Sequence, residues 1–469
     1  MSNLLASLRS STDALDALTK ALGVSQNNIS NAGTPGYAKQ TVRMQARAFN
    51  PESGLASGVS TGKLQSARDA HVEHSVRVQN GRTSAAETSA TSLARLEHAL
   101  QLSSGDSVPS ALNQLYRSFS AWAVAPDDMG SKENILTAAE GVASAFRGTA
   151  QKLAGLTTDN ASEIQSVVDR VNRLAGRIRE YNSDIRSGAT GDAGIESGIH
   201  ATLDELSADA DIEAIQQPDG TYALLFGGEH PLVIGTEQYE LSVSFEVPAD
   251  PPPIHSGAAP AARILTSTGQ DVTSTAKGAR LGSLLDFRHE SLASIQGSSS
   301  DAGELNKLAA KILERLNEAW PPPAQPFFVA GASAVSIAHT LSVNPALEPA
   351  MLDAVEPGPP PVSNGKALQL AALASPSNAG DKLEGLSFTE FYAKIATRVG
   401  SDLNDAKFDQ QSQTQLLAQV EEFRNRISGV SLDEEAIQIV QFQRAYQASA
   451  RMVSVIDELL QTAVNLGRS

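Results

Sequence analysis

The chain has 469 residues, enough for about three domains of roughly 150 residues each. It carries 36 Lys and Arg against 53 Asp and Glu, and the net charge of -17 makes nucleic acid and anionic membranes poor partners. Since there is no cysteine, disulfides, thiolate metal sites and a cysteine nucleophile are excluded. No stretch reaches the ~18 continuous apolar residues of a membrane-spanning helix, and a cleaved signal peptide is not expected.

The N-terminal segment predicts a helix with a narrow apolar seam. Leucine or isoleucine recurs seven apart at Leu8, Leu15, Leu22 and Ile29, with Leu4 and Leu18 in a companion row. This heptad spacing places the side chains on one helix face and is typical of a coiled coil. Ser11 and Ser25 complete the companion row, so the seam has two polar interruptions.

A proline-glycine turn ends this helix, in the stretch N-N-I-S-N-A-G-T-P-G-Y. Pro35 and Gly36 suit the two central positions of a type II turn. Gly33 is placed to close the helix, because glycine tolerates the left-handed conformation of helix ends. Asn28 and Asn31 lie on one face, where their amides either cap the local backbone or bond to a neighbouring chain. Spacing alone favours local capping.

The middle of the chain predicts long helices around an inserted β-rich module. Apolar spacings of three and four residues predict helices at 84–102, 131–156, 161–185, 281–288 and 305–320, and again from residue 366. Short apolar runs between Pro and Gly turns predict strands within 212–247 and at 263–265. Pro-rich residues 321–361 predict loops and short irregular elements.

The C-terminal segment predicts a second long amphipathic helix. Its apolar face steps by three and four residues through Ala445, Ala448, Met452, Val455, Leu459, Thr462 and Leu466. Ser431 and Glu434 have the spacing of a capping box at its start, which contributes ~1 kcal/mol. We therefore expect a mainly α fold, elongated and multidomain, in which the N- and C-terminal helices pair in a coiled-coil stalk.

Candidate catalytic residues are few. His71 and His74 lie three apart but lack further metal ligands, so a solvated helix face is the better interpretation. His289 and Glu290 form a bare dipeptide without a partner. The sequence contains no G-x-S-x-G, no phosphate-binding P-loop and no H-E-x-x-H. We predict no catalytic, cofactor or metal site.

The two ends together resemble the signatures of flagellar axial proteins. The form N-N-I-S-N-A-x-T-P-G-Y-x-x-Q, after an apolar heptad, is similar to that of rod, hook and hook-associated proteins. Towards the C-terminus, S-G-V-S-L-D-E-E from Ser428 and Q-F-Q-R-A-Y-Q-A-S-A from Gln441 resemble the matching signature, and the first favours hook-associated proteins. Residues 164–185, 219–235 and 282–288 resemble the same group, so the resemblance spans most of the chain.

Some residues depart from the pattern of this group. Gly33 and the pair Ala38-Lys39 stand where Asn and Ser-Arg are more usual, which weakens the hook-associated assignment slightly and leaves the axial one intact. Between Phe328 and Asn364 the chain is shorter than in longer relatives. An outermost domain is therefore expected to be reduced.

The resemblance implies a nested domain order. Residues 1–37 and 431–469 would form a terminal coiled-coil domain lining an inner tube, and 38–211, 276–320 and 362–430 a helical second domain. Residues 212–275 would form a β-rich outer module, and 321–361 a Pro-rich irregular connection.

The resemblance also implies an assembly interface on the terminal segments. Its expected residues are Leu8, Leu15, Leu18, Leu22, Asn28, Ile29, Asn31, Pro35, Gly36, Tyr37, Ser431, Glu434, Gln443, Tyr446, Met452, Val455, Leu459 and Leu466.

The implied function is structural. The protein would form a ring at the hook-filament junction that adapts the hook to the flagellin filament. Implied partners are its own copies, the hook protein below, a second junction protein and the filament above, and an export chaperone. It would be extracellular, exported by the flagellar type III system.

Two alternatives remain open. One is a hook or distal-rod structural protein, because those share the terminal signatures. The other is a secreted enzyme on a flagellar scaffold, with chemistry in residues 212–361, where His230, His255, His289 and His339 are scattered. A cluster of three of these side chains would favour the enzyme.

Overall fold

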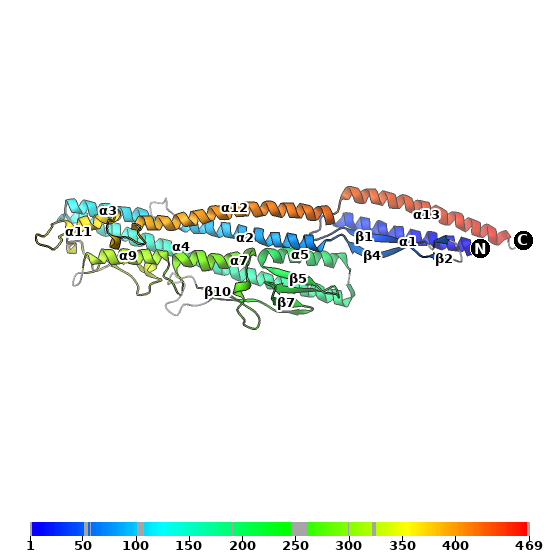
Figure 1. The fold of residues 1–469 in the computed structure, drawn as a ribbon, viewed down its shortest axis with the longest axis horizontal. Coiled ribbons are helices and arrows are strands. Elements are labelled where there is room, and N and C mark those ends of the chain that lie inside the picture. Colours follow the sequence, from blue (N-terminus) through cyan, green and yellow to red (C-terminus); the bar gives the residue numbers. More distant parts are fainter. Residues whose placement is uncertain are drawn as a thin grey trace.

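Long helices run along an elongated molecule, with both chain termini at one end (Figure 1). The computed structural model describes residues 2–50, 55–56, 58–100, 107–189, 191–245, 260–298, 300–320 and 325–466. The fold is mainly α with a small β-rich insert, and the N- and C-terminal helices lie side by side. The expected fold class is confirmed.

The long helices account for most of the chain. They are α1 (Ser2–Asn31), α2 (Ala70–Leu100), α3 (Val108–Val124), α4 (Met129–Asp184), α5 (Ala193–Asp209), α7 (Ala279–Asp286), α9 (Glu304–Glu318), α12 (Phe388–Ser428) and α13 (Leu432–Leu466). Shorter helices are α8 (Ala293–Gln296), α10 (Ile337–Thr340) and α11 (Gly365–Ala371). Within the described ranges, no helix is long and apolar enough for a membrane crossing.

Side chains at the helix starts fix several of these bounds. Ser107 caps α3, Asp128 caps α4 and Asp192 caps α5, each accepting a hydrogen bond from a backbone N–H of the first turn. At α12, Ser387 and Glu390 form a reciprocal capping box. These caps satisfy backbone donors that a helix leaves unpaired at its start.

Helix α4 corrects one prediction. The sequence pattern predicted two helices, at residues 131–156 and 161–185, whereas α4 is continuous over 56 residues. The connecting residues 157–160 contain neither Gly nor Pro, and the Thr157 hydroxyl donates to the Leu153 carbonyl without breaking the helix. At ~1.5 Å per residue such a helix is roughly 84 Å long.

Two hydrophobic cores lie along α4. The first core lies at the far end of the molecule, opposite the chain termini. There the first half of α4 packs with α3, α9 and the start of α12 around the aromatic side chains of Phe119, Trp122, Trp320 and Phe327. The second core packs the later half of α4 with α5, α7 and the strands. We call the part of the molecule from α2 to α12 the body.

The β-rich insert packs on the second core. Its strands are β5 (Ile212–Gln216), β6 (Tyr222–Phe226), β7 (His230–Ile234), β8 (Glu237–Gln238), β9 (Ser242–Phe245) and β10 (Ala262–Leu265). The first four form an antiparallel sheet in sequence order, and β9 pairs with β10. Gly220, Gly227 and Gly228 have positive φ at the turns, as the sequence pattern predicted.

The Pro-rich region forms short elements. Strands β11 (Phe328–Val329) and β12 (Ser342–Val343) pair antiparallel, and α10 lies between them in the sequence. Phe327, Phe328 and Leu341 are buried in the core of the far end. This part of the chain therefore closes the end of the rod opposite the termini.

A two-stranded ribbon accompanies α1. It consists of β1 (Gln40–Ala46) and β4 (Val59–Ser66), paired antiparallel, and the short strands β2 (Phe49–Asn50) and β3 (Leu55–Ala56) lie further along it. The sequence pattern did not predict these strands. We call α1, this hairpin and α13 the stalk.

A buried arginine joins α4 to the β-rich insert. Arg288 donates to the carbonyl oxygens of Pro260 and Thr157, at 2.6 and 2.9 Å, and to Asn160 Oδ1 at 3.1 Å. No described carboxylate forms an ion pair with it, and burial lowers its pKa to about 10. Its guanidinium also lies 5.0 Å from the Phe245 ring centroid.

The substitution Arg288→Ala is expected to lower the free energy of unfolding by about 2 to 4 kcal/mol, because it leaves buried acceptors without donors. Urea unfolding followed by far-ultraviolet circular dichroism measures the change. The matched control is Arg179→Ala, whose guanidinium is partly exposed beside Glu180. It should change stability by less than about 0.5 kcal/mol. Equal effects of the two substitutions would contradict the assigned role of Arg288.

Candidate assembly site on the terminal helices

The stalk is built from two helices of opposite direction. Helix α1 runs from the N-terminus towards the body, and α13 runs back from the body to the same end (Figure 1). On the side that faces the rest of the stalk, α1 buries Ala17, Ala21 and Ser25. Their small side chains let the neighbouring elements approach α1 closely. The hairpin packs beside α1 as well, so α1 contacts both α13 and the hairpin.

The predicted apolar seam of α1 is only partly covered. Leu8, Leu15, Leu18, Leu22 and Ile29 are all half-buried. Each therefore keeps apolar surface in contact with solvent. The described chain alone does not complete the burial that a coiled-coil seam favours.

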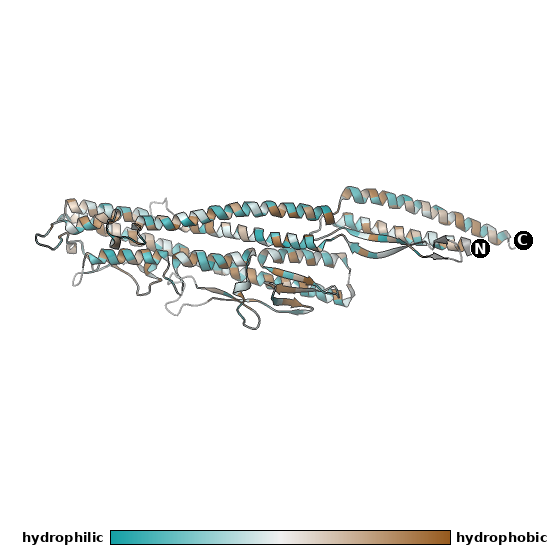
Figure 2. Ribbon diagram, in the orientation of Figure 1, coloured by the Kyte–Doolittle hydropathy of each residue, from teal (hydrophilic) through white to brown (hydrophobic). Residues whose placement is uncertain are grey.

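The predicted face of α13 is turned outward. Gln443 and Tyr446 are exposed, and Met452, Val455 and Leu459 are 58%, 52% and 50% exposed. Leu466 is the last residue of the helix. Hydrophobic residues recur along α13 to its end (Figure 2). The row that is more covered instead contains Ile439, Phe442, Val453, Ile456 and Leu460.

Helix α13 thus has two neighbouring apolar rows. One row contributes Ile456, 6% exposed, to the contact with the rest of the stalk, and the second row faces solvent. The sequence analysis identified the second row and missed the first, although Phe442, Val453 and Ile456 have the same helical spacing. We call Met452, Val455 and Leu459 the α13 outer row.

The turn after α1 has the predicted type II form. The Tyr37 N–H donates to the Thr34 carbonyl at 3.1 Å, and Gly36 has a φ of 71°. The prediction for Gly33 was wrong, because Gly33 does not adopt positive φ. The helix instead ends through the bond from the Thr34 N–H to the Asn31 carbonyl at 2.9 Å.

This turn packs closely on α5. The Ser197 hydroxyl donates to the Pro35 carbonyl at 2.9 Å. A Cβ atom at Gly36 would lie 2.4 Å from the Ser197 carbonyl oxygen and 2.8 Å from the Ala201 nitrogen. Only glycine fits this contact between the stalk and the body.

The two asparagines before the turn bond within the chain. Asn28 is 1% exposed, and its Nδ2 donates to the Gln40 carbonyl at 2.9 Å. The Gln40 N–H and the Tyr37 hydroxyl both donate to Asn28 Oδ1, each at 2.9 Å. Asn31 Nδ2 donates to the Asn27 carbonyl at 3.0 Å. Asn31 is therefore a local cap, whereas Asn28 links α1 to β1.

A lysine connects the start of the hairpin to the start of α13. Lys39 Nζ lies 3.0 Å from Glu434 Oε2 and 3.2 Å from Glu435 Oε1. Burial disfavours its charge, but hydrogen bonds to both carboxylates outweigh burial and raise the pKa of Lys39. The expected capping box forms only by half: the Glu434 N–H donates to Ser431 Oγ at 3.4 Å, while the Glu434 carboxylate binds Lys39.

Charged side chains fill the joint where the stalk meets the body. Arg68 donates to the Gly36 carbonyl, to Glu73 Oε1 at 2.9 Å and to Glu196 Oε1 at 3.2 Å. Arg424 donates to Asp204 Oδ2 at 2.9 Å. Burial raises the pKa of Asp204, an effect that Arg424 opposes. The joint is held largely by hydrogen bonds and ion pairs.

A buried histidine lies within the same cluster. His200 is 6% exposed and its Nε2 lies 3.4 Å from the Tyr222 hydroxyl oxygen. Burial lowers its pKa to about 2, and the charges of Arg68, Arg77 and Arg424 act in the same direction. His200 is therefore a neutral, structural side chain.

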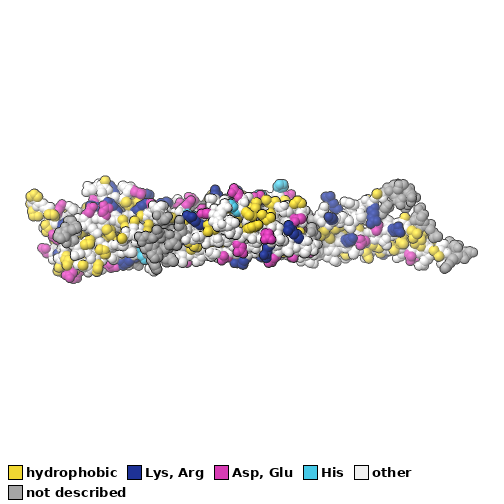
Figure 3. Space-filling model, turned by 90° about the horizontal axis from the view of Figure 1, so that it is seen from below, with side chains coloured by type: hydrophobic (Ala, Val, Ile, Leu, Met, Phe, Trp, Pro, Cys, Tyr) yellow, Lys and Arg dark blue, Asp and Glu magenta, His cyan; other side chains and the backbone are white. Residues whose placement is uncertain are grey.

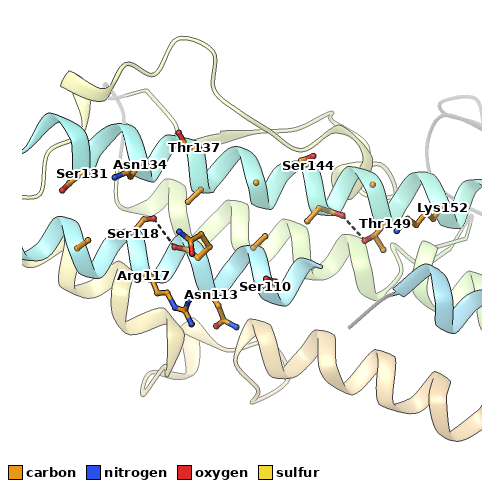
Figure 4. Close-up of a pocket in the computed structure, with 17 residues that line it drawn as sticks. Ser110, Asn113, Arg117, Ser118, Ser131, Asn134, Thr137, Ser144, Thr149 and Lys152 are labelled. Atoms are coloured by element: carbon orange, nitrogen blue, oxygen red, sulfur yellow. Dashed lines mark hydrogen bonds between the residues drawn. The ribbon is translucent and has the colours of Figure 1, made fainter. Parts of the chain in front are cut away.

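A groove of about 940 Å³ lies between α3 and α4 (Figure 4). Its lining is mostly small and weakly polar, with Arg117 and Lys152 as its charged side chains. The hydroxyls of Ser118 and Thr149 bond to carbonyls of their own helices. The lining contains no carboxylate and no imidazole, the side chains that most often act in general acid-base catalysis.

The candidate histidines do not form a site. His71 and His74 are exposed on α2, and His289 Nε2 accepts from the Ala262 N–H at 3.0 Å. Among the described residues, no three His, Asp or Glu side chains are grouped so as to hold a metal ion. His255 lies outside the described residues.

Two family profiles match the chain. The family described as "Flagellar hook-associated protein FlgK helical domain" matches residues 93–320, and "Flagellar basal body rod FlgEFG protein C-terminal" matches residues 425–466. The second match covers all of α13 and the end of α12.

The chain is similar to curated proteins along its whole length. Flagellar hook-associated protein 1 of Bacillus subtilis (strain 168) is 23% identical over 524 residues, covering 99% of each chain. The protein of the same name from Escherichia coli (strain K12) is 23% identical over 558 residues, covering 98% of this chain and 99% of that one.

A solved structure has a similar fold. It is the flagellar hook junction protein FlgK from Burkholderia pseudomallei, with a TM-score of 0.63 at 14% identity. The match covers 76% of this chain and 100% of that chain. At this identity it supports the fold alone.

Gly36→Ala is expected to lower the free energy of unfolding by about 1 to 3 kcal/mol, because of its positive φ and its contact with α5. Gly33→Ala is the control, since a Cβ there meets nothing within 4 Å. It should change stability by less than about 0.5 kcal/mol. Thermal unfolding compares the two variants. A similar loss in both would show that the close contact at Gly36 is unimportant.

Neutral His200 predicts a pH dependence of stability. Below pH ~6.5 the unfolded chain protonates this imidazole while the folded chain does not, so stability is complete above pH ~6.5 and falls as the pH is lowered. The wild type should lose about 2 kcal/mol more than His200→Gln between pH 7 and pH 5. Urea unfolding at both pH values measures the difference. His74→Gln, at an exposed imidazole, should behave as the wild type.

Proposed function

Because the chain belongs to the flagellar hook-associated protein 1 family, we propose that it forms the junction between the flagellar hook and the filament. Membership is supported by the helical-domain match, by the rod-protein match over α13 and by relatives aligned over nearly the whole chain. The protein is a structural component of the flagellar axis. Its copies assemble into that axis, and the specific contacts below are part of the proposal.

The observation that carries the proposal is the α13 outer row. Its three large apolar side chains are about half exposed on a helix whose neighbouring row already packs in the stalk. Burying the remaining surface contributes about 1 kcal/mol for each side chain. Repeated in every subunit, such contacts stabilise an array of parallel stalks.

We assign the two helices of the stalk, α1 and α13, to the inner tube of this array. Residues 1–37 and 431–469 line it, and the half-buried leucines of α1 and the α13 outer row contact neighbouring copies. Residues 38–211, 276–320 and 362–430 form a helical layer outside it. Residues 212–275 face outward and 321–361 close the far end. Because the contacts are heterologous and do not close on themselves, different proteins can continue the array above and below.

The proposed partners follow from this arrangement. Copies of the chain form a ring, with the hook protein below it and a second junction protein and the flagellin filament above. Before assembly the α13 outer row is accessible to an export chaperone. The protein is then extracellular after export by the flagellar type III system.

The role is proposed to be without catalysis. The lining of the groove between α3 and α4 has no carboxylate and no imidazole, and the described histidines of residues 212–361 do not form a cluster. Neither feature favours the secreted-enzyme alternative.

The test is to delete the gene in its own host and to complement it with variants. We expect deletion to leave bare hooks, with flagellin lost to the medium, as seen by electron microscopy and a flagellin blot. Missing or malformed hooks would move the assignment to the hook or rod, and normal filaments would overturn the proposal.

Complementation tests the α13 outer row. Met452→Glu with Leu459→Glu should fail to restore filaments, because each substitution places a charge in the subunit contact. The control is Gln447→Glu with Ser454→Glu, which adds the same charge at exposed positions on another face of α13. It should restore filaments. Circular dichroism of both purified variants should match the wild type, since the substituted residues are exposed.

A further inference from the structure

One segment of the stalk has a charge opposite to that of the whole chain. Residues 17–68 contain six Lys and Arg and one acidic residue, Glu52, although the complete chain has a net charge of -17. Segregation of this kind creates a local positive field on an acidic protein. The hairpin lies within this basic segment.

The hairpin has exposed cations on one face and exposed apolar side chains on the other, because successive residues of a strand point to opposite faces. Arg43 and Lys63 are exposed, and so are Met44 and Leu64, at 39% and 40%. Within the described part of the chain, no ion pair involves Arg43 or Lys63, whereas Arg47 lies 2.9 Å from Asp13. Lys and Arg side chains gather over the stalk in the view of Figure 3. We call the exposed cations Arg43 and Lys63 the hairpin patch.

A complementary surface runs along α12. Phe408 is 76% exposed, and Leu416, Phe423 and Ile427 are also exposed. Asp402, Asp405 and Asp409 are exposed near the start of this row, and no ion pair in the described chain involves Asp402 or Asp405. The helical spacing from Asp405 through Leu416 to Ile427 places this row on one face, away from the side that packs on α2. We use the name α12 acidic face for these exposed residues, which are Asp402, Asp405, Phe408, Asp409, Leu416, Phe423 and Ile427.

We propose that the hairpin patch of one copy docks on the α12 acidic face of a neighbouring copy. The two surfaces carry opposite charges, and such electrostatic complementarity favours recognition between subunits. Within one copy the hairpin lies along the stalk and α12 along the body, at different positions on the long axis (Figure 1). The contact therefore joins two copies displaced along that axis, and it gives a staggered array.

This inference rests on the proposed function, because it requires copies to assemble side by side. It adds a contact between the stalk of one copy and the body of another, outside the α13 outer row. A contact of opposite charges also excludes pairing of two equivalent faces. Repulsion between two basic hairpins or two acidic faces disfavours the closed dimer and favours the staggered arrangement.

Cysteine cross-linking tests the contact, since the chain has no cysteine of its own. Full-length Lys63→Cys and Asp405→Cys variants are expressed together in the deletion host, flagella are isolated and oxidised, and dimers are detected on a non-reducing gel. The matched control replaces Asp405→Cys by Lys407→Cys, at an exposed residue on another side of α12. A disulfide requires Cβ atoms roughly 4 Å apart, so only facing residues react.

We expect a cross-linked dimer with Asp405→Cys in isolated flagella, its loss in the dilute monomer, and none with Lys407→Cys. Filaments that assemble normally without any cross-link would overturn this inference and leave the junction role intact. Equal cross-linking of both α12 variants, or cross-linking of Lys63→Cys to Leu459→Cys, would also overturn it. Failure of the junction role itself would appear separately, as normal filaments in the deletion host.

A charge exchange gives a second measurement. Arg43→Glu with Lys63→Glu should reduce the number of filaments per cell, and so should Asp402→Lys with Asp405→Lys. Combining all four substitutions restores opposite charges and should restore filaments. If each pair is neutral, or if the combination is no better than either pair, the electrostatic contact is refuted.

Discussion

One buried amide holds the end of α1 to the start of the hairpin, at the place where the stalk meets the body. Asn28 holds the backbone of Gln40 by two hydrogen bonds, so the end of α1 and the start of the hairpin cannot separate without exposing unpaired polar groups. Beside it the Lys39 N–H donates to the Ser428 carbonyl at 2.8 Å, and the Lys39 ammonium binds the first turn of α13. Both chain crossings between stalk and body therefore meet at one point. Hydrogen bonds and ion pairs fix this point, because little apolar surface is buried there.

The two parts of the molecule use apolar surface differently. The body buries its aromatic and aliphatic side chains in two cores along α4, and Trp122 and Phe119 are fully covered. The stalk leaves its leucines half-buried and the α13 outer row exposed. Burial is the main favourable contribution to folding. The body thus holds its stability within one chain, and in the proposed assembly the stalk gains part of its stability from neighbouring copies.

The long amphipathic helices were predictable from the sequence, whereas the contacts between stalk and body were not. The pairing of the two ends and the turn at Gly36 followed from spacing and turn chemistry. Helices α3 and α5 were missed although Ser107 and Asp192 are strong caps and Leu112, Leu115 and Phe119 repeat with helical spacing. The strands of the hairpin were not predicted, because they are polar and largely exposed and show no alternation of apolar and polar residues. The joint brings Arg68, Glu196 and Arg424 together from distant parts of the chain. The pattern of neighbouring residues in a sequence does not predict such contacts.

The continuity of α4 has a mechanical consequence. Because one unbroken helix passes through both cores, it stiffens the body against bending between them. Force applied at the far end reaches the stalk through the residues around Lys39 and Ser428 and through the packing of Pro35 and Gly36 on α5. Bending of the subunit is then concentrated at the joint between stalk and body, which polar contacts hold together. In the proposed assembly, each subunit can tilt slightly at this joint without deforming its own core.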